Sequence, residues 1–157
     1  MPITLRDTVE EDESLLFELY ASTRAEEIAR VPWTLEQKEA FLKMQFDAQH
    51  SFYEERYPAG TYQVILEDDV AVGRLYVLRE PELIRILDIT IVPEKRRKGI
   101  ATELVGRVQE EGRQSQRPVQ IYVETVNPSL GLFERLGFSR RSEEGFNYLL
   151  EWTPEAR

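Results

Sequence analysis

The chain has 157 residues, with 29 acidic and 20 basic side chains that give a formal net charge of -9, and it contains no cysteine. This length suits one domain, residues 1–157, and 41% hydrophobic residues are enough for a packed core. The acidic balance repels nucleic acid and anionic membranes, and the lack of cysteine excludes disulfides, thiolate metal sites and a cysteine nucleophile.

The sequence shows neither a leader segment nor a metal-binding motif. Its N-terminus, "MPITLRDTVEEDESLL", is acidic and lacks the apolar stretch of a secretory signal. No apolar run approaches the roughly 20 residues that span a bilayer. The single histidine, His50, cannot build a multi-histidine metal site. We therefore expect a cytoplasmic protein with no metal and no membrane or nucleic-acid partner.

The first half of the chain predicts a strand, two helices and a hairpin. Apolar and polar residues alternate over 3–9, and helical spacing follows over 11–30 until Pro32. The sequence "TLEQ" fits a capping box that starts a second helix over 35–56. Two strands then surround a turn at Asp68 and Asp69.

The second half of the chain predicts four more strands and two more helices. A strand over 83–92 precedes a helix from about Gly99 to 114, and a strand over 119–124 precedes a short helix that Gly137 closes. An antiparallel pair, 138–152, ends the chain. No repeat or linker interrupts this order, which predicts an α+β fold with one mixed sheet and helices on its faces.

Four consecutive cations, Lys95–Lys98, lie where the predicted strand gives way to the predicted helix. The first N–H groups of a helix point outward and its dipole is positive there, so phosphate oxygens are favoured. Gly99 leaves room for close approach, Ala101 keeps the next turn small, and the Thr102 hydroxyl could add a hydrogen bond. The segment indicates a phosphate site, and the alternative is a solvated basic loop. The patterns GxxxxGK[ST] and GxGxxG are absent, which disfavours nucleotide-hydrolysing and dinucleotide-binding enzymes.

This segment resembles the acetyl-CoA signature of the GCN5-related N-acetyltransferase (GNAT) superfamily, [RQ]-x-x-G-x-[GA], with Arg96, Gly99 and Ala101 at its defined positions. The preceding "ITIVP" resembles that family's fourth strand, and "VETVNPSLGLFERLGF" is similar to its second signature. The element order matches over nearly the whole chain. The resemblance implies a central mixed, mostly antiparallel sheet of six or seven strands, splayed between strands 4 and 5 and flanked by about four helices.

The resemblance also implies how a cofactor would bind. Backbone groups of Ile91 and Val92 would pair with the pantetheine arm, and the amides from Arg97 to Thr102 would hold the pyrophosphate. Asn127 would bind the pantetheine, although "NPS" also reads as a helix cap. The implied cofactor-binding residues are Ile91, Val92, Arg96, Arg97, Lys98, Gly99, Ile100, Ala101, Thr102, Asn127, Phe133 and Arg135.

Glu124 is the first candidate for the catalytic base. It ends the fifth strand, and "IYVE" resembles the "LxVE" of ribosomal-protein acetyltransferases, where a glutamate has that role. Only two residues separate Glu124 from Asn127, fewer than in those relatives. Asp88 is the second candidate, and the alternative for Asp88 is an ion pair with a residue such as Arg85.

Phe133 departs from the family pattern. The family often has a tyrosine at this place that protonates the leaving thiolate, and this chain reads "LFERLGF". Phenylalanine has no proton to give, so either another group such as Tyr122 does so or the thiolate leaves without help.

The resemblance implies that the first two helices and the loop between them line the acceptor pocket, and the aromatic candidates there are Trp33, Phe46, Tyr53 and Tyr76. Aromatic residues at helical spacing also build cores, which is the alternative for each of them. The acidic surface is compatible with a cationic or polyamine-like acceptor.

The sequence therefore predicts an acyl-CoA-dependent N-acyltransferase that uses acetyl-CoA as co-substrate and no metal. It would transfer the acetyl group directly to a primary amine of a small molecule, peptide or protein, as a monomer or homodimer. One alternative is a CoA-binding sensor or regulatory module with little catalysis. A nucleic-acid-binding module is disfavoured, because the four cations lie in one short turn of an acidic chain.

Overall fold

The computed structural model describes residues 2–155. The chain divides into two compact units: unit 1 comprises Met1–Arg74 and Thr90–Arg96, and unit 2 comprises Leu75–Ile89 and Arg97–Arg157. The boundary passes through the third and fourth strands. In chain order the elements are β1 (Ile3–Asp7), a 3-10 turn (Glu10–Asp12), α1 (Glu13–Ala29), α2 (Leu35–Arg56), β2 (Thr61–Glu67), β3 (Val70–Arg79), β4 (Ile84–Ile91), a 3-10 turn (Pro93–Lys95), α3 (Ile100–Ser115), β5 (Val119–Glu124), α4 (Leu130–Arg135), β6 (Ser139–Glu144) and β7 (Asn147–Trp152).

The strands form a seven-stranded mixed sheet in the order β1-β2-β3-β4-β5-β7-β6. β1 pairs antiparallel with β2, and β7 pairs antiparallel with both β5 and β6. β4 and β5 are parallel. The predicted mixed, mostly antiparallel sheet with four α-helices is thus confirmed. No helix in residues 2–155 is long and apolar enough to cross a membrane.

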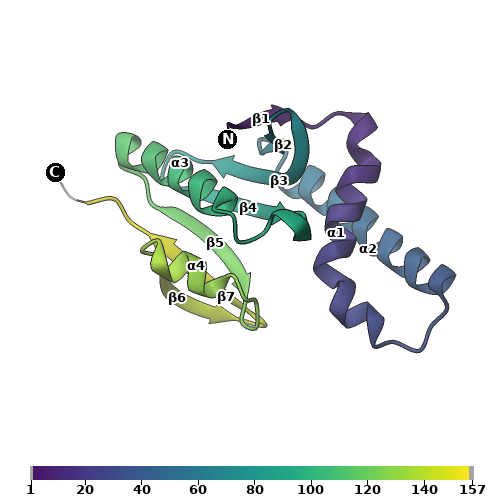
Figure 1. The fold of residues 1–157 in the computed structure, drawn as a ribbon. Coiled ribbons are helices and arrows are strands. Elements are labelled where there is room, and N and C mark those ends of the chain that lie inside the picture. Colours follow the sequence, from purple (N-terminus) through teal and green to yellow (C-terminus); the bar gives the residue numbers. More distant parts are fainter. Residues whose placement is uncertain (1, 156–157) are drawn as a thin grey trace. The chain divides into compact units, whose positions relative to one another are not determined.

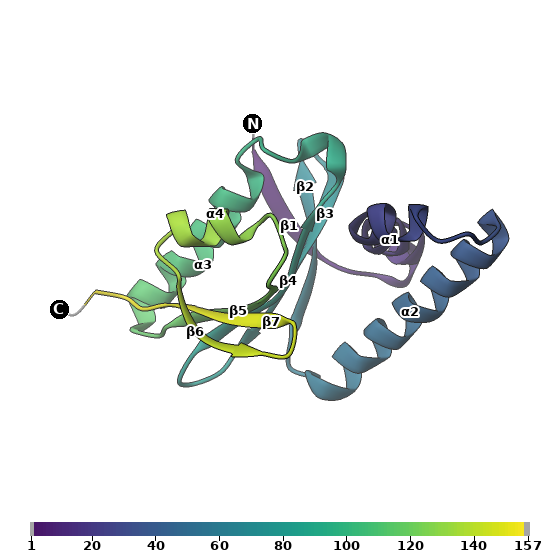
Figure 2. The ribbon, with the colours of Figure 1, turned by 90° about the horizontal axis from the view of Figure 1, so that it is seen from below.

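In unit 1, α1 and α2 lie side by side and bury an apolar cluster between them (Figures 1 and 2). The cluster consists of Leu16, Leu19 and Tyr20 from α1 and Leu42 and Phe46 from α2. Each set recurs at helical spacing, so one face of each helix is buried.

The predicted capping box starts α2. The Gln37 N–H donates to the Thr34 hydroxyl at 3.1 Å, and the Thr34 N–H donates to the Gln37 side-chain oxygen at 3.0 Å. The predicted turn between β2 and β3 is confirmed as well, because Asp68 and Asp69 have φ of 50° and 67°, the signs that a two-residue hairpin turn requires.

The start of α1 differs from the prediction. The sequence predicts a helix from Glu11, whereas a 3-10 turn occupies Glu10–Asp12 and α1 begins at Glu13. We attribute this irregularity to Asp12, which is 7% exposed and whose carboxylate accepts two hydrogen bonds from Arg6 at 2.8 and 2.9 Å. It also accepts the Val9 N–H at 2.8 Å. The Arg6 hydrogen bonds hold the pKa of Asp12 below its ordinary value.

In unit 2, α3 and α4 cover one face of the β5, β7 and β6 strands (Figures 1 and 2). The Gln109 side chain, 4% exposed, donates from α3 to the Leu136 carbonyl just after α4 at 2.8 Å. On β5, Val119, Ile121 and Val123 are buried, whereas Tyr122 and Glu124 are exposed. This period of two places Tyr122 and Glu124 on the same face of β5.

β4 changes its pairing along its length. Its register with β5 covers three residue pairs, from Ile84 with Val119 to Ile86 with Ile121, and then stops. Beyond β4, the Val92 N–H donates to the Val72 carbonyl of β3 at 2.8 Å, whereas the Ile84 N–H donates to the Pro118 carbonyl at 2.9 Å. On a regular strand, residues an even number apart direct their N–H groups to the same edge. Ile84 and Val92 are eight residues apart and bond to opposite sides, so the regular alternation of the strand is interrupted between them. The predicted splay between β4 and β5 is confirmed.

We expect Gly73→Ala to destabilise the protein. A Cβ at Gly73 would lie 2.3 Å from the Thr90 carbonyl oxygen and 3.2 Å from the Ile91 Cα, so backbone atoms would have to move. The expected loss in free energy of unfolding is about 1–3 kcal/mol, measured by urea denaturation. Gly106→Ala is the control, because that glycine lies inside α3 with nothing within 4 Å and its replacement should stabilise by about 0.5–1 kcal/mol. Equal stability of Gly73→Ala and wild type would contradict the close approach.

The Asp12 carboxylate gives a pH-dependent prediction. Asp12→Asn should lower the free energy of unfolding at pH 7 by about 1–3 kcal/mol, because charge-assisted hydrogen bonds from Arg6 are lost. Since the folded pKa is lowered, this stabilisation is complete above the unfolded pKa of about 4 and is lost as the pH falls through the lowered folded pKa.

Urea denaturation of both proteins between pH 7 and pH 2 measures this difference. Glu10→Gln, in the same turn, is the control, and it should change the free energy of unfolding little over this pH range. A difference between wild type and Asp12→Asn that stays constant into acid would show that Asp12 does not carry the effect.

Candidate functional site

In unit 2, α3 begins with amide groups that have no acceptor among the described residues. Gly99 precedes the helix in a left-handed conformation, with φ of 84°, and no side chain caps the helix. The Gly99 carbonyl accepts the Glu103 N–H at 3.0 Å. Within residues 2–155, the N–H groups of Ile100, Ala101 and Thr102 have no acceptor, as expected for the first turn of an uncapped helix. Because a Cβ at Gly99 would meet nothing within 4 Å, the space beside these amides is open.

The four cations before α3 fall into two pairs with different roles. In unit 1, the Lys95 ammonium lies 2.9 Å from the Glu67 carboxylate, and this hydrogen bond raises the pKa of Lys95. Arg96 donates through Nε to the Ile91 carbonyl at 2.9 Å and through Nη2 to the Ser22 hydroxyl at 3.3 Å. Lys95 and Arg96 are thus engaged within the protein.

Arg97 and Lys98, which open the second part of unit 2, are exposed. Neither side chain makes a hydrogen bond or ion pair with any residue in the part of the chain that the structure describes, and the same holds for Arg135 in α4. Arg97 has φ of 62°, an uncommon value for a residue with a side chain. These three residues are among those predicted to bind the cofactor, and their charges are available to a ligand.

Asn127 acts as a turn residue and still has donors to spare. The Ser129 N–H donates to the Asn127 side-chain oxygen at 2.8 Å, and the Leu130 N–H donates to its backbone carbonyl at 3.2 Å. α4 begins at Leu130, after Ser129 as N-cap, so Asn127 holds the turn before the helix. Its side chain is exposed and its amide NH₂ remains a donor, so the predicted cofactor contact and the cap reading are compatible.

The candidate catalytic residues of unit 2 differ in exposure. Glu124, at the end of β5, and Tyr122, 42% exposed, face solvent on one face of the strand. Asp88 is half-buried within β4. Arg85 does not pair with Asp88: it donates to the Gln120 side chain at 2.8 Å and its guanidinium lies 5.4 Å from the Tyr122 ring. Arg85 is thus engaged with β5, and the alternative that Asp88 pairs with a buried arginine stays a prediction.

Phe133 is 2% exposed and contacts the Phe138 ring edge-on, with 5.4 Å between centroids. The ring that stands where relatives often have tyrosine therefore belongs to the core of unit 2. A hydroxyl added to this ring would be buried, and it would cost free energy unless it found a hydrogen-bond partner.

The predicted pantetheine contacts, Ile91 and Val92, lie in unit 1. The Ile91 carbonyl accepts from Arg96, and the Val92 N–H donates to Val72 while its carbonyl accepts the Lys95 N–H at 3.0 Å. Both backbone groups of Val92 are engaged in the structure. A pantetheine arm would have to use the second lone pair of a carbonyl or displace one of these bonds.

Among the predicted acceptor-binding residues, Phe46 and Tyr76 are each 3% exposed and belong to the core, which is the alternative stated for them above. Trp33, 41% exposed, contacts Phe41 edge-on at 5.2 Å between centroids. Tyr53 is half-buried near the C-terminal end of α2.

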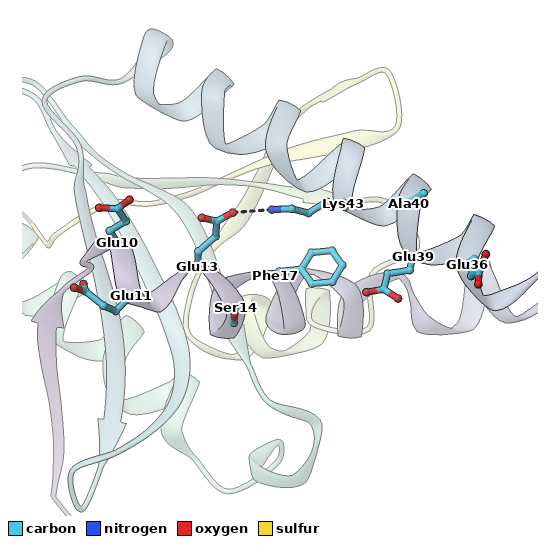
Figure 3. A pocket seen from close by; sticks show the side chains of 9 residues that line it. All are labelled: Glu10, Glu11, Glu13, Ser14, Phe17, Glu36, Glu39, Ala40 and Lys43. Atoms are coloured by element: carbon cyan, nitrogen blue, oxygen red, sulfur yellow. Dashed lines mark hydrogen bonds and ion pairs between the residues drawn. The ribbon is translucent and has the colours of Figure 1, made fainter.

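An acidic cavity in unit 1 was not predicted from the sequence. It has a volume of about 780 Å³ and lies between α2 and the start of α1 (Figure 3). The Lys43 ammonium lies 2.7 Å from Glu13 and 3.1 Å from Asp47, and 5.2 Å from the Phe46 ring centroid. The residues that line the cavity are Glu10, Glu11, Glu13, Ser14, Phe17, Glu36, Glu39, Ala40 and Lys43. Five glutamates around one lysine make this cavity negative, and such a site attracts cations. The sequence signal is the acidic residues grouped at the starts of two helices.

Solved structures with the same fold include the PaiA N-acetyltransferase of Thermoplasma acidophilum in complex with coenzyme A, with a TM-score of 0.71 and 16% identity over 98% of this chain and 99% of that one. An acetyltransferase from Thermus thermophilus matches with a TM-score of 0.69 and 18% identity over 98% and 97% of the two chains. A chimera of the spermidine N-acetyltransferase SpeG of Vibrio cholerae with hSSAT has a TM-score of 0.67 and 19% identity over 98% and 96%. At these identities the likeness concerns the fold.

No curated protein matches the sequence closely enough to count as a relative. The model of the acetyltransferase (GNAT) family matches residues 19–138, which is most of the chain and includes the turn before α3, β5 and α4. The chain belongs to the acetyltransferase (GNAT) family, a family of enzymes that use acyl-CoA.

Proposed function

We propose that the protein transfers an acetyl group from acetyl-CoA directly to the primary amine of an acceptor. The observation that carries this proposal is the start of α3, where free amide groups and two unpaired cations follow the point at which β4 leaves β5. A pyrophosphate suits this arrangement, because helix amides and the guanidinium and ammonium groups all stabilise its negative oxygens.

The residues that would hold the cofactor divide by chemistry. The amides of Gly99 to Thr102 and the side chains of Arg97 and Lys98 would bind the pyrophosphate, and Arg135 would bind nearer the adenosine end. The Asn127 amide would donate to the pantetheine. Acetyl-CoA supplies an activated acyl group, so the protein's task is to orient this thioester and a neutral amine toward each other.

Glu124 is the residue we assign as base. An ammonium group cannot attack a carbonyl until it loses a proton, and a solvent-facing carboxylate at the end of β5 can accept that proton directly or through one water. Asp88, half-buried in β4, is the second candidate.

The leaving thiolate requires a proton that Phe133 cannot supply. Tyr122 stands two residues before Glu124 on the same face of β5 and carries an exposed hydroxyl, so it is the residue we assign as acid. Its ring lies beneath the Arg85 guanidinium, which restricts its orientation.

The acidic cavity of unit 1 supports a cationic acceptor. Several carboxylates around one apolar ring would hold the ammonium groups of a small amine or a basic peptide better than they would hold a neutral or anionic molecule. The name of the SpeG chimera refers to spermidine, a cationic amine, which is consistent with such an acceptor for this chain.

Calorimetry with acetyl-CoA and with CoA, followed by thioester consumption across a panel of amines, tests this proposal. We expect both molecules to bind and at least one cationic primary amine to be acetylated. Binding without turnover on any amine would favour the CoA-binding sensor, and binding only to an oligonucleotide would contradict both.

Gly99→Leu should abolish CoA binding in the same calorimetric assay, because a side chain there enters the open space beside the α3 amides. Gly145→Leu is the matched control. Gly145, in the turn between β6 and β7, also has positive φ, 64°, and a Cβ there would meet nothing within 4 Å. A leucine at this position would have backbone strain comparable to that of a leucine at position 99. We expect this control to retain CoA affinity. Equal affinity in wild type and Gly99→Leu would remove the assigned phosphate site.

Phe133→Tyr should lower stability without raising the rate. The new hydroxyl would enter a position that is 2% exposed, at a cost of about 1–3 kcal/mol in free energy of unfolding if it finds no partner. With the most active amine of the panel, kcat and its pH profile should stay close to those of the wild type. A large gain in kcat at unchanged stability would show that the ring tip opens onto the reacting groups.

A further inference from the structure

The Arg96 guanidinium joins the end of β4 to helix α1 within unit 1. Its Nε donates to the Ile91 carbonyl, the last residue of β4, at 2.9 Å. Its Nη2 donates to the Ser22 hydroxyl of α1 at 3.3 Å, across 74 residues of sequence. Arg96 ends the 3-10 turn Pro93–Lys95, so this link lies on the segment that leads directly into the turn before α3.

The Ser22 hydroxyl is oriented for this contact. It donates its single hydrogen to the Leu19 carbonyl of its own helix at 2.7 Å. A hydroxyl has one hydrogen and two lone pairs, so only its lone pairs remain to meet the Arg96 donor. The bond from Ser22 to Leu19 therefore fixes the direction in which Ser22 accepts.

The segment 93–96 is held at both ends by such links. At its start, the Val92 N–H donates to the Val72 carbonyl at 2.8 Å. At its end, Lys95 pairs with Glu67 at 2.9 Å and Arg96 reaches Ile91 and Ser22. The next residues along the chain are Arg97, with its positive φ, and the amides that we assign to the pyrophosphate. A fixed entry to this turn reduces the conformational freedom that the turn must lose when an anion binds.

We propose that Ser22 is a positioning residue for the cofactor loop and acts through Arg96, an inference that rests on the proposed acetyl-CoA-dependent function. Arg96 is exposed and Ser22 half-buried, so the contact contributes little to the burial of the core. Its contribution is to hold the backbone of residues 93–98 in the conformation that presents the α3 amides. Loss of the Ser22 hydroxyl should therefore weaken cofactor binding more than it weakens the fold.

Ser22→Ala in the full chain tests the proposal. We expect the Kd for coenzyme A by calorimetry and the KM for acetyl-CoA to rise about three- to tenfold, the range for one partly exposed hydrogen bond to a charged group. The value of kcat should stay unchanged, because Ser22 touches no reacting atom. Ser22→Thr keeps the hydroxyl and should restore the wild-type Kd.

Thr23→Val is the matched control. The Thr23 hydroxyl also donates to a carbonyl of α1, that of Tyr20, at 2.6 Å, and it makes no contact with Arg96. Its replacement should change the melting temperature by a similar amount and leave both Kd and KM as in wild type. In an Arg96→Gln background, which itself weakens binding, Ser22→Ala should have no further effect.

Three outcomes would overturn the proposal. A Kd and KM for Ser22→Ala equal to those of Thr23→Val would show that the hydroxyl positions nothing. An undiminished effect of Ser22→Ala in the Arg96→Gln background would show that it does not act through Arg96. If wild-type protein does not bind coenzyme A, the proposed function and this inference are both wrong. Equal Kd values for wild type and Ser22→Ala would contradict the inference alone.

Discussion

The proposed chemistry of this protein depends on the place where β4 stops pairing with β5. Three residue pairs join the two strands, and the strands then separate although both continue for several residues. Gly73 of β3 lies so close to the Thr90 carbonyl that no side chain fits between them, which holds the end of β4 against β3. The exposed residues of β5, Tyr122 and Glu124, thus lie beyond the last β4–β5 pair, and the chain after β4 is free to turn into α3. Without this separation a parallel pair would bond these backbone groups to each other.

The turn before α3 is organised by contacts that a reading of the local sequence cannot supply. The capping box of Thr34 and Gln37, the hairpin turn at Asp68 and Asp69, and the bounds of β5 are all predicted correctly, because each depends on residues within a few positions. Lys95 and Arg96 look identical in sequence to Arg97 and Lys98, and all four are predicted to surround a phosphate. The partners that distinguish them, Glu67 and Ser22, lie in distant segments of the sequence. The start of α1 differs for another reason, because Arg6, six residues before Asp12 on β1, binds the Asp12 carboxylate and no helical pattern predicts that contact.

The same limit applies to the aromatic residues. Phe46 and Phe133 are both candidates for a role at the site, and both are buried. Helical spacing places an aromatic ring on a face, but whether that face meets core or ligand depends on the element opposite. For Phe46 this is Phe17 and Tyr20 of α1, and for Phe133 it is Phe138 just before β6. A family pattern indicates which position in the chain a residue occupies. It does not indicate whether that residue is exposed, because exposure depends on how the elements of this sequence pack.

The proposed anion site of a chain with a net charge of -9 depends on which cations have a carboxylate partner. In unit 2, Arg79 and Arg117 share Glu111, while Arg107, Arg113, Arg140 and Arg141 each have a glutamate of their own. Arg97, Lys98 and Arg135 have none within the described residues, so the positive potential concentrates around them and around the α3 amides. Physiological salt screens charges beyond about 8 Å, so the distant carboxylates weaken this local field little. They still repel any long polyanion that reaches past the site, and a short ligand with a few clustered phosphates avoids that repulsion. At the proposed site a compact phosphorylated molecule would therefore be favoured over a nucleic acid by its short length as much as by its charge.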